Sequence, residues 1–110
     1  MRRGEVYLVS LNPSIGHEQQ GTRPVLVVSA DAFNKVTRMP MIVQITSGGA
    51  YARNAGFAVS LEAAGTQTVG FILCNQLRSL DVAARGGRRL ESVPSEIVDD
   101  VLARLATFLE

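Results

Sequence analysis

The sequence predicts a mainly β fold (β+α), a small and strongly bent sheet or barrel of antiparallel strands with one C-terminal α-helix. Short apolar runs rich in β-branched residues recur between residues 5 and 80, as expected of strands. Stretches containing Gly, Pro and Asn separate these runs and are typical of turns. Only the end of the chain places apolar residues at helical spacing. The 110 residues suffice for one domain, which we expect to span residues 1–110.

The first half of the chain is expected to hold three strands. Glu5–Leu11 is apolar and β-branched, and the following stretch 12–22, with one Pro and two Gly, is expected to be a loop. Pro24–Ser29 is a nearly continuous apolar run typical of a central strand, and its proline is tolerated at the first position of that strand. Ala30–Asn34 indicates a short turn or a single helical turn that its aspartate can cap. Met39–Thr46 then forms the third strand.

The second half adds shorter strands. A polar, glycine-rich loop over Ser47–Gly56 leads to a strand over Phe57–Leu61, and a turn separates that strand from the next, Thr68–Cys74. Leu77–Leu80 either continues or restarts the sheet, and 84–89, with three Arg and two Gly, is expected to be a basic turn. Five or six strands joined by tight turns favour a bent sheet or barrel over an open, flat one.

The C-terminal segment differs in kind from the rest. Pro94 suits the first position of a helix, and Glu96 suits its positive end. The apolar residues that follow recur at spacings of three and four, namely Ile97, Val98, Val101, Leu102, Leu105, Phe108 and Leu109. This spacing predicts an amphipathic helix with one apolar stripe.

Composition excludes several classes of protein. Apolar residues make up 46% of the chain and charged residues 19%, which is typical of a globular protein rather than a disordered one. No apolar run approaches the length of a membrane span, and no apolar signal core follows the charged N-terminus, so we expect a cytoplasmic location. The chain has one Cys, one His and no close cluster of carboxylates. We therefore expect no disulfide scaffold, no metal site and no cofactor.

The basic residues are nearly all arginine. Ten of the eleven are Arg, and residues 1–95 hold 10 basic and 6 acidic groups, a net charge of +4, whereas the last 15 residues carry −3. A guanidinium binds phosphate through a planar fork, so an arginine-rich body points to an anionic partner such as a nucleic acid. A genome rich in G and C would also favour Arg over Lys. The charge pattern, taken alone, favours this genomic explanation over an anionic partner.

Two groups of polar residues in the first half are candidates for chemistry. His17, Glu18 and Arg23 fall within seven residues. An imidazole or carboxylate can transfer a proton at neutral pH, and a guanidinium can stabilise charge on a phosphate. Thr46 and Ser47 precede two glycines, where small donors and a bare backbone can approach a ligand. The alternatives are an ordinary surface loop with an Arg–Glu pair and a plain Ser/Gly turn.

A third group lies in the second half. Asn75 and Gln76 directly follow an apolar strand, and their amides could read the edges of bases. Nearby arginines could hold phosphates, namely Arg78, Arg85, Arg88 and Arg89. A solvated basic turn explains Arg88 and Arg89 equally well.

Together these motifs resemble the MazF/PemK toxin family, in its Kid-like (PemK) and ChpB-like branches. The most specific element is E-Q-x-G-x-R-P over residues 18–24, and Thr46-Ser47-Gly48-Gly49 and Asn75-Gln76-Leu77-Arg78 follow in the family's order. The resemblance covers nearly the whole chain. It implies an SH3-like barrel and a homodimeric toxin of a type II toxin–antitoxin system.

The resemblance also implies an activity and partners. The activity is that of an mRNA interferase, a sequence-specific endoribonuclease that cleaves single-stranded mRNA without metal, by attack of the substrate's 2′-hydroxyl, and so inhibits translation and growth. The implied partners are the mRNA and a cognate antitoxin with an acidic, flexible C-terminal segment, and DNA only indirectly through that antitoxin. No membrane is implied.

The resemblance also assigns site residues. It places Arg23 and Thr46 in the catalytic centre, with Glu18 beside Arg23 and with His17 as in the Kid-like members. It implies RNA contacts from five residues, namely Ser47, Phe57, Asn75, Gln76 and Arg85.

One departure bears on the proton-transfer roles. Kid-like members carry an Arg and an Asp, both implicated in acid–base catalysis, where this chain has Leu73 and Asn75. ChpB-like members have an apolar residue and Asn there. Neither side chain exchanges a proton near neutral pH. Proton transfer must then fall on Arg23, Thr46, Glu18 or His17.

Two alternatives follow from the same residues. Leu73 and Asn75 are also compatible with a catalytically impaired, RNA-binding relative. A CcdB-like toxin that binds gyrase is the other alternative, but this chain contains no Trp, and its end, Thr107-Phe108-Leu109-Glu110, lacks the tryptophan with which those toxins grip gyrase.

Overall fold

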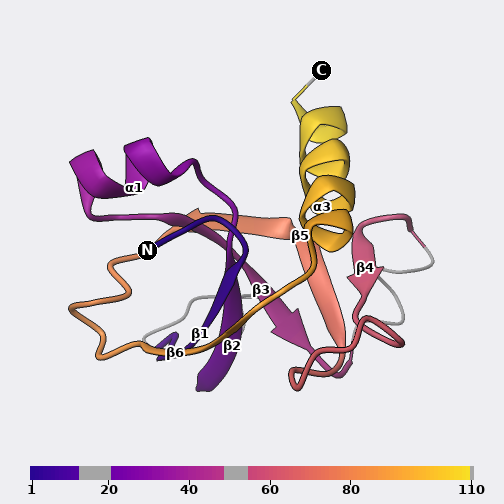
Figure 1. Ribbon diagram of the computed structural model, residues 1–110, viewed down its shortest axis with the longest axis horizontal. Helices are drawn as coiled ribbons and strands as arrows, with labels where there is room; N and C mark the ends of the chain where they lie inside the picture. The colour runs from indigo at the N-terminus through magenta and orange to yellow at the C-terminus, as the bar shows by residue number, and fades with distance from the viewer. Residues whose placement is uncertain (13–20, 49–54, 110) are drawn as a thin grey trace.

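A computed structural model describes residues 1–12, 21–48 and 55–109. Within these residues six strands form one antiparallel sheet in the order β4-β5-β3-β2-β1-β6. The strands are β1 (Glu5–Ser10), β2 (Thr22–Val27), β3 (Met41–Thr46), β4 (Ala58–Ser60), β5 (Phe71–Ser79) and β6 (Arg88–Ser92). The helices are α1 (Asp31–Thr37) and α3 (Ser95–Phe108). The mainly β fold with a C-terminal helix is confirmed (Figure 1).

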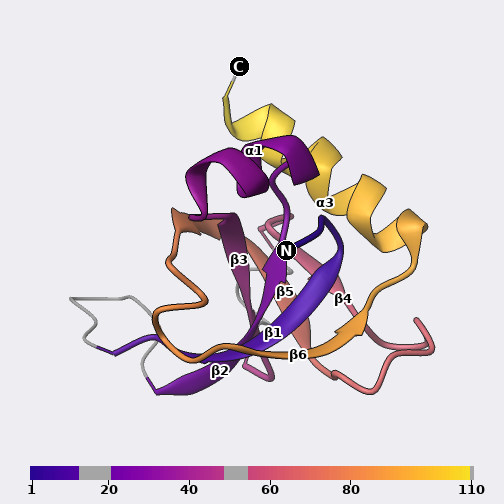
Figure 2. The same cartoon turned by 60° about the vertical axis from the view of Figure 1, so that its left-hand side comes forward.

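The two faces of the sheet pack into separate cores. The first core joins residues of the sheet to Val101 and Leu105 of α3, which are 0% and 8% exposed. The second core lies on the opposite face and contains Val9, Val25 and Ile42. Because neighbouring side chains of a strand point to opposite faces, most of the sheet is covered on both sides. Figure 2 shows the strong bend of the sheet below the two helices.

The two edge regions of the sheet meet at Glu91. Glu91 lies on β6, and its carboxylate accepts hydrogen bonds from the backbone N–H of Gln67 at 3.0 Å and of Thr68 at 2.6 Å. The Thr68 hydroxyl donates a third bond at 2.5 Å. Gln67 and Thr68 precede β5, so these bonds tie the β4–β5 connection to the far edge strand and give the sheet its barrel-like curvature.

The central strand was predicted correctly, but its start was not. β2 is flanked by β1 and β3 and begins at Thr22, so Pro24 is its third residue rather than its first. The hydrogen-bonded ladder between β2 and β3 begins at Val25. A proline has no N–H to donate to a neighbouring strand, and the ladder to β3 accordingly stops one residue short of Pro24.

The turn expected over Ala30–Asn34 is a longer helix without the expected cap. α1 runs to Thr37, and its N-cap residue, Ala30, makes no side-chain capping bond. Asp31 does not cap the helix, because its Oδ1 accepts a hydrogen bond from the backbone N–H of Arg3 at 2.8 Å. The prediction that Asp31 caps this segment was therefore wrong.

The later strands also differ from the prediction. β5 is continuous from Phe71 to Ser79, so the strand expected over Thr68–Cys74 begins later and Leu77–Leu80 continues it. The basic turn expected over 84–89 ends early, because Arg88 and Arg89 already belong to β6 and pair with Leu8 and Tyr7 of β1.

The C-terminal helix was predicted with nearly correct bounds. α3 starts at Ser95, one residue after Pro94. Its apolar stripe packs against the first core over most of its length, but Phe108 is 39% and Leu109 82% exposed. No helix of the described residues is long and apolar enough to cross a membrane.

Candidate active site

Arg23 and Thr46 fall on one face of the sheet, two residues beyond the end of the ladder that joins β2 and β3. Val25 of β2 pairs with Gln44 of β3, and moving two residues along each antiparallel strand brings Arg23 opposite Thr46. Side chains two residues apart point to the same face. Both residues therefore share the face of Val25, which belongs to the second core on the side away from α3. The structure thus brings together two predicted residues from separate segments.

The same row extends to both neighbouring strands. Arg23 pairs with Val9 of β1, and Thr46 pairs with Phe71 of β5. The Thr46 hydroxyl oxygen accepts a hydrogen bond from the backbone N–H of Gly48 at 3.3 Å. Ser47, between them, is exposed. Arg23 and Thr46 are half-buried, so the row combines fixed positions with access from solvent.

Gly70 permits the close approach of β5 to β3 at Thr46. Its φ is +114°, and a Cβ atom built there would lie 2.4 Å from the carbonyl oxygen of Thr46. A side chain on residue 70 would therefore overlap the backbone that carries the Thr46 hydroxyl. The sequence shows this glycine, but only the strand register reveals why it is needed.

Asn75 and Gln76 sit in an irregular part of β5. Leu73 pairs with Gln44 and Arg78 with Ile42, so β5 has four residues, Cys74–Leu77, where β3 has only Val43. Counting two residues on from Leu73 reaches Asn75, and two back from Arg78 reaches Gln76. Alternation back from Arg78 places Gln76 on the face that carries Thr46, whereas the alternating exposure of Asn75, Leu77 and Ser79 places Asn75 on the opposite face. Asn75 is exposed and Gln76 half-buried.

Phe57 lies beside this irregular segment. Its carbonyl oxygen accepts a hydrogen bond from the backbone N–H of Cys74 at 3.0 Å, which extends the pairing of β4 with β5 by one step. Its ring packs edge-to-face against Phe108 of α3, with ring centroids 5.4 Å apart and an interplanar angle of 85°. Phe57 is half-buried, and it stands one residue along the chain from Ala58, which pairs with Leu73.

Arg85 is anchored at the end of β1. Its Nη1 donates to the carbonyl oxygens of Ser10 at 3.1 Å and Asn12 at 2.7 Å. The Asn12 side chain in turn accepts from the N–H of Gly21 at 3.0 Å, and the N–H of Leu11 donates to the Gly21 carbonyl at 2.9 Å. Arg85 therefore holds the chain at the end of β1, and Leu11 and Asn12 join this chain to Gly21, two residues before Arg23.

Two predicted site residues cannot be placed. His17 and Glu18 lie outside the described residues, and so does the stretch 49–54 that follows Thr46-Ser47-Gly48. Both segments join strands at the end of the sheet that carries Arg23 and Thr46. Asn12, after β1, and Gly21, before β2, therefore lie at the end of the sheet where Arg23 and Thr46 are found.

Arg89 has a structural partner away from this row. Its Nε lies 2.6 Å from Oε2 of Glu5, whose other oxygen accepts from the Tyr7 hydroxyl at 3.1 Å and from the Arg2 N–H at 2.7 Å. Burial raises the pKa of Glu5, but the hydrogen bonds from Arg2, Arg89 and Tyr7 outweigh it and hold the pKa below its usual value. Arg89 therefore belongs to an ion pair on β6 and not to the solvated basic turn that was the alternative.

Sequence reasoning missed Gln44. This side chain is 1% exposed, lies between Ile42 and Thr46 on the same face, and has no hydrogen-bond partner for its Oε1 among the described residues. Arg78, which pairs with Ile42, has a buried Nη1 that also lacks a partner there. The sequence signal for Gln44 was a single amide side chain within the otherwise apolar run Met41–Thr46. Predicting a strand over this run does not by itself draw attention to that side chain.

Within the described part of the chain, His, Cys, Asp and Glu form no group of three that could hold a metal ion. Cys74 is buried beneath α3, and burial raises the pKa of its thiol to about 11. It is therefore a neutral packing residue at physiological pH.

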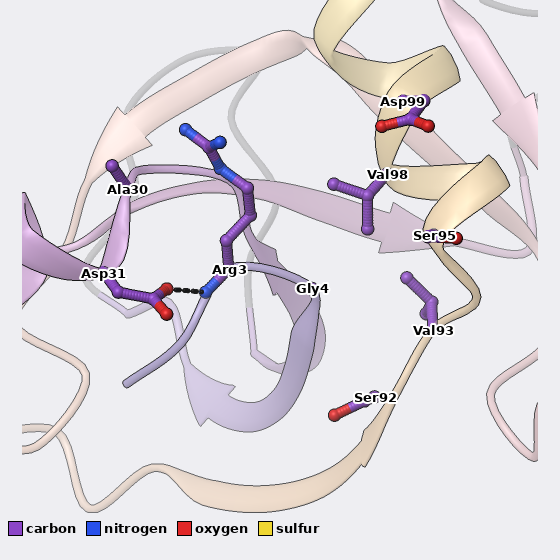
Figure 3. Close-up of a pocket in the computed structure, with 9 residues that line it drawn as sticks. All are labelled: Arg3, Gly4, Ala30, Asp31, Ser92, Val93, Ser95, Val98 and Asp99. Carbon is purple, nitrogen blue, oxygen red and sulfur yellow. Dashed lines mark hydrogen bonds between the residues drawn. The ribbon is translucent and has the colours of Figure 1, made fainter.

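A cavity of about 490 Å³ lies elsewhere, where the N-terminal segment meets the start of α3 (Figure 3). Arg3 projects into it, and Asp31 and Asp99 stand on its walls. None of the predicted site residues lines this cavity, so it is separate from the row formed by Arg23 and Thr46.

Comparison with known proteins identifies the family. The profile of the PemK-like, MazF-like toxins of type II toxin–antitoxin systems matches residues 2–109. Endoribonuclease PemK of Escherichia coli is 60% identical over 109 residues, which are 99% of this chain and 82% of the relative. Endoribonuclease toxin ChpB of Escherichia coli K12 is 42% identical, over 98% of this chain and 93% of the relative.

A solved structure supports the same assignment. The crystal structure of MazF from Deinococcus radiodurans superimposes with a TM-score of 0.86 at 32% identity, covering 99% of this chain and 96% of the other. The match in both sequence and fold favours the hypothesis of an endoribonuclease over that of a gyrase-binding toxin. The chain therefore belongs to the family of PemK-like, MazF-like toxins of type II toxin–antitoxin systems, and it is an endoribonuclease.

Proposed function

We propose that this endoribonuclease toxin cleaves single-stranded mRNA without a metal ion, and that Arg23 and Thr46 form its catalytic centre. The observation that supports the proposal is the β2–β3 register, which, extended by two residues from Val25 and Gln44, brings Arg23 and Thr46 to one accessible face. A guanidinium and a hydroxyl at neighbouring cross-strand positions can contact one phosphate together.

The chemistry needs no nucleophile from the protein. The 2′-hydroxyl of the RNA attacks the adjacent phosphorus, a new O2′–P bond forms, and the P–O5′ bond breaks. A base accepts the 2′-hydroxyl proton, and an acid protonates the leaving 5′-oxygen. The products are a 2′,3′-cyclic phosphate and a 5′-hydroxyl. Arg23 stabilises the charge that builds on the phosphate oxygens, and Thr46 donates a hydrogen bond to one of them.

The base is proposed to be Glu18 or His17, because Leu73 and Asn75 cannot accept a proton at neutral pH. Glu18 and His17 belong to the chain between Asn12 and Gly21, and these two described residues are held together next to the start of β2.

The RNA path is proposed to run from the row formed by Arg23 and Thr46 toward the β4–β5 side of the sheet. Ser47 and Asn75 are exposed, and Gln76 and Phe57 are half-buried. Phe57 offers an aromatic surface for a base, and the two amides offer donors and acceptors for base edges. Arg85 uses Nη1 on main-chain carbonyls, so its other guanidinium nitrogens would be the ones that reach a phosphate.

We also propose a homodimer and a cognate antitoxin as partners. The MazE–MazF structure from Deinococcus radiodurans, with a TM-score of 0.82 and 32% identity, covers 99% of this chain and 95% of that one, and it supports an antitoxin partner. An acidic, flexible segment of an antitoxin would be attracted to Arg23 and Arg85 and would cover the RNA path. RNA and antitoxin would then compete, and added salt would weaken both complexes.

The test is RNA cleavage by purified protein in EDTA, with product ends identified by mass. Arg23→Ala should lower the cleavage rate by about 10²–10³-fold, the usual effect of removing one charge-stabilising donor. Thr46→Val should also lower it, and a 2′-deoxy nucleotide on the 5′ side of the scissile bond should abolish cleavage while binding persists. The matched control is Arg2→Ala, because Arg2 is an exposed arginine whose guanidinium lies 3.7 Å from the carboxylate of Asp31, and it belongs to no proposed site.

Two outcomes would contradict the mechanism. Near-normal cleavage by a folded Arg23→Ala protein would remove Arg23 from the catalytic centre. Cleavage of the 2′-deoxy substrate, or a requirement for magnesium, would exclude attack by the 2′-hydroxyl. RNA binding without cleavage by the unmodified protein would indicate a catalytically impaired relative.

A further inference from the structure

The helix α3 contacts both the residue before the proposed RNA-stacking residue Phe57 and the ring of Phe57 itself. Figure 1 shows α3 beside β4 and β5. Arg104 donates from Nη1 to the carbonyl oxygen of Gly56 at 2.6 Å. Phe108, one turn further along the helix, packs edge-to-face against the ring of Phe57. One helix therefore holds both the backbone before Phe57 and its side chain.

The guanidinium of Arg104 is oriented by a second contact in addition to its bond to Gly56. Its Nε donates to Oδ1 of Asp100, four residues earlier on α3, at 2.9 Å. The two donors, Nε and Nη1, belong to one rigid plane, so the bond to Asp100 sets the direction of the bond to Gly56. Gly56 has a φ of +81°, a conformation that other residues rarely adopt. Its carbonyl accepts from Arg104 in this unusual conformation.

Phe57 is half-buried, so part of its side chain stays accessible to a base, although the cluster of Ala58 and Leu73 also packs against it. In an edge-to-face pair one ring presents its edge to the face of the other. Phe108 therefore covers at most one face of the Phe57 ring. The backbone on the other side of Phe57 is held too, because its carbonyl accepts from Cys74. Phe57 is thus fixed by contacts from α3 and from β5.

We propose that Arg104 and Phe108 are positioning residues for RNA binding, which act by fixing the stacking surface of Phe57. The proposal rests on the proposed RNA-binding role of Phe57. Because the stacking partner is ordered before RNA arrives, the protein does not have to order it on binding. RNA affinity then depends on the last two turns of α3, although neither Arg104 nor Phe108 touches RNA.

The experiment measures RNA binding and base stacking separately. The probe is an RNA that the protein cleaves, synthesised with a 2′-deoxy nucleotide at the scissile position and with 2-aminopurine at each flanking base in turn. The chain has no Trp, so protein fluorescence interferes little with 2-aminopurine. Quenching of one 2-aminopurine by the wild type but not by Phe57→Ala identifies the base that stacks on Phe57.

Phe57→Ala should raise the Kd of the RNA by about 5-fold or more, as expected for loss of a stacked base. Arg104→Met and Phe108→Leu should each raise the Kd by about 3- to 10-fold, a part of the same stacking contribution, and should reduce the 2-aminopurine quenching. The cleavage rate at saturating RNA should change less than 2-fold, since the catalytic centre is intact. Matched controls are Lys35→Met, which removes an exposed cation from α1, and Leu109→Ala, which shortens the 82% exposed neighbour of Phe108.

A double-mutant cycle separates positioning from direct contact. In a Phe57→Ala background, Arg104→Met should have no further effect on the Kd, because the residue it positions is gone. Arg104→Lys keeps the charge but not the planar pair of donors, and it should behave like Arg104→Met. Full affinity in Arg104→Lys together with lost affinity in Arg104→Met would indicate an ionic contact with RNA and overturn the proposal.

The remaining outcomes are also decisive. Wild-type affinity in both Arg104→Met and Phe108→Leu, with weakened binding in Phe57→Ala, would overturn the positioning role alone. Unchanged binding in Phe57→Ala would overturn the RNA-binding role of Phe57 and the positioning role with it. If Arg104→Met fails to fold, Phe108→Leu still tests the proposal, because Phe108 is 39% exposed and lies near the end of the helix.

Discussion

Replacing Gly70 by alanine tests whether β5 must approach β3 closely for Thr46 to hold its position. A Cβ atom at residue 70 would lie 2.4 Å from the carbonyl oxygen and 2.9 Å from the carbonyl carbon of Thr46. Both neighbours are backbone atoms, so no side-chain rotation can relieve the overlap. The ends of β3 and β5 must move apart, at the place where Thr46 pairs with Phe71.

The expected loss of stability has two parts. The φ of +114° at Gly70 is a conformation that costs an alanine about 1–3 kcal/mol. The overlap with Thr46 adds about 1–3 kcal/mol, as overpacking usually does. Gly65→Ala is the matched control, because Gly65 has a φ of +77° but no atom within 4 Å of the new Cβ. That variant should lose only about 1–2 kcal/mol from the backbone strain.

Urea unfolding followed by circular dichroism measures both losses, and RNA cleavage measures the effect on Thr46. The cleavage rate of folded Gly70→Ala should fall by at least about 10-fold, since displacement of a catalytic group by about 1 Å can cost up to 10²-fold. Gly65→Ala should cleave at the wild-type rate. Equal losses of stability in the two variants, or normal cleavage by Gly70→Ala, would refute the close approach or its importance for Thr46.

Three further predictions follow from buried and paired side chains. Burial raises the pKa of Glu91, but hydrogen bonds from Thr68 and Gln67 outweigh burial and hold the pKa below its usual value. The ionised carboxylate therefore stabilises the fold at pH values above the usual carboxyl pKa. This stabilisation is lost as the pH falls through the lowered pKa of the folded protein. Glu91→Gln should thus lower the Tm at pH 7 and reduce the fall of the Tm with decreasing pH. A fall of the Tm in acid as steep as that of the wild type would contradict this role of Glu91. Burial raises the pKa of Cys74 to about 11, so a thiol reagent at pH 8 should modify it only after urea unfolding, and fast reaction of native protein would contradict this. Arg85→Met should lower the free energy of unfolding by about 1–2 kcal/mol, because two main-chain carbonyls lose a charged donor; an unchanged urea midpoint would count against it.

The elements with strong periodicity were predictable from sequence. The apolar run after Pro24 indicated a central strand, and β2 is one. Helical spacing after Pro94 indicated α3 to within one residue. β6 was missed because it begins with Arg88 and Arg89, and an edge strand whose side chains meet solvent shows no apolar alternation. Its pairing with β1 includes a register shift, which no local pattern reveals.

The candidate site was predictable as a set of residues but not as a surface. Asn75 and Gln76 are neighbours in sequence, and in a regular strand they would point to opposite faces. The irregularity opposite Val43 decides which of the two shares a face with Thr46, namely Gln76 instead of Asn75. A sequence pattern cannot indicate such an irregularity, because it arises from the register of two strands rather than from either strand alone. The same holds for Gly70, whose role depends on the position of Thr46.

The placement of Arg23 and Thr46 on one face has a specific structural origin. The two residues are far apart in sequence and are separated by α1, which connects the end of β2 to the start of β3. Because these strands are antiparallel, the connection brings Val27 next to Ile42 near α1, and the same register carries Arg23 and Thr46 to the opposite end of both strands. A shift of one residue would turn the side chain of Thr46 to the other face. Apolar packing of Val25 and Ile42 in the second core opposes such a shift. The geometry of the candidate catalytic centre therefore depends on apolar residues that take no part in its chemistry.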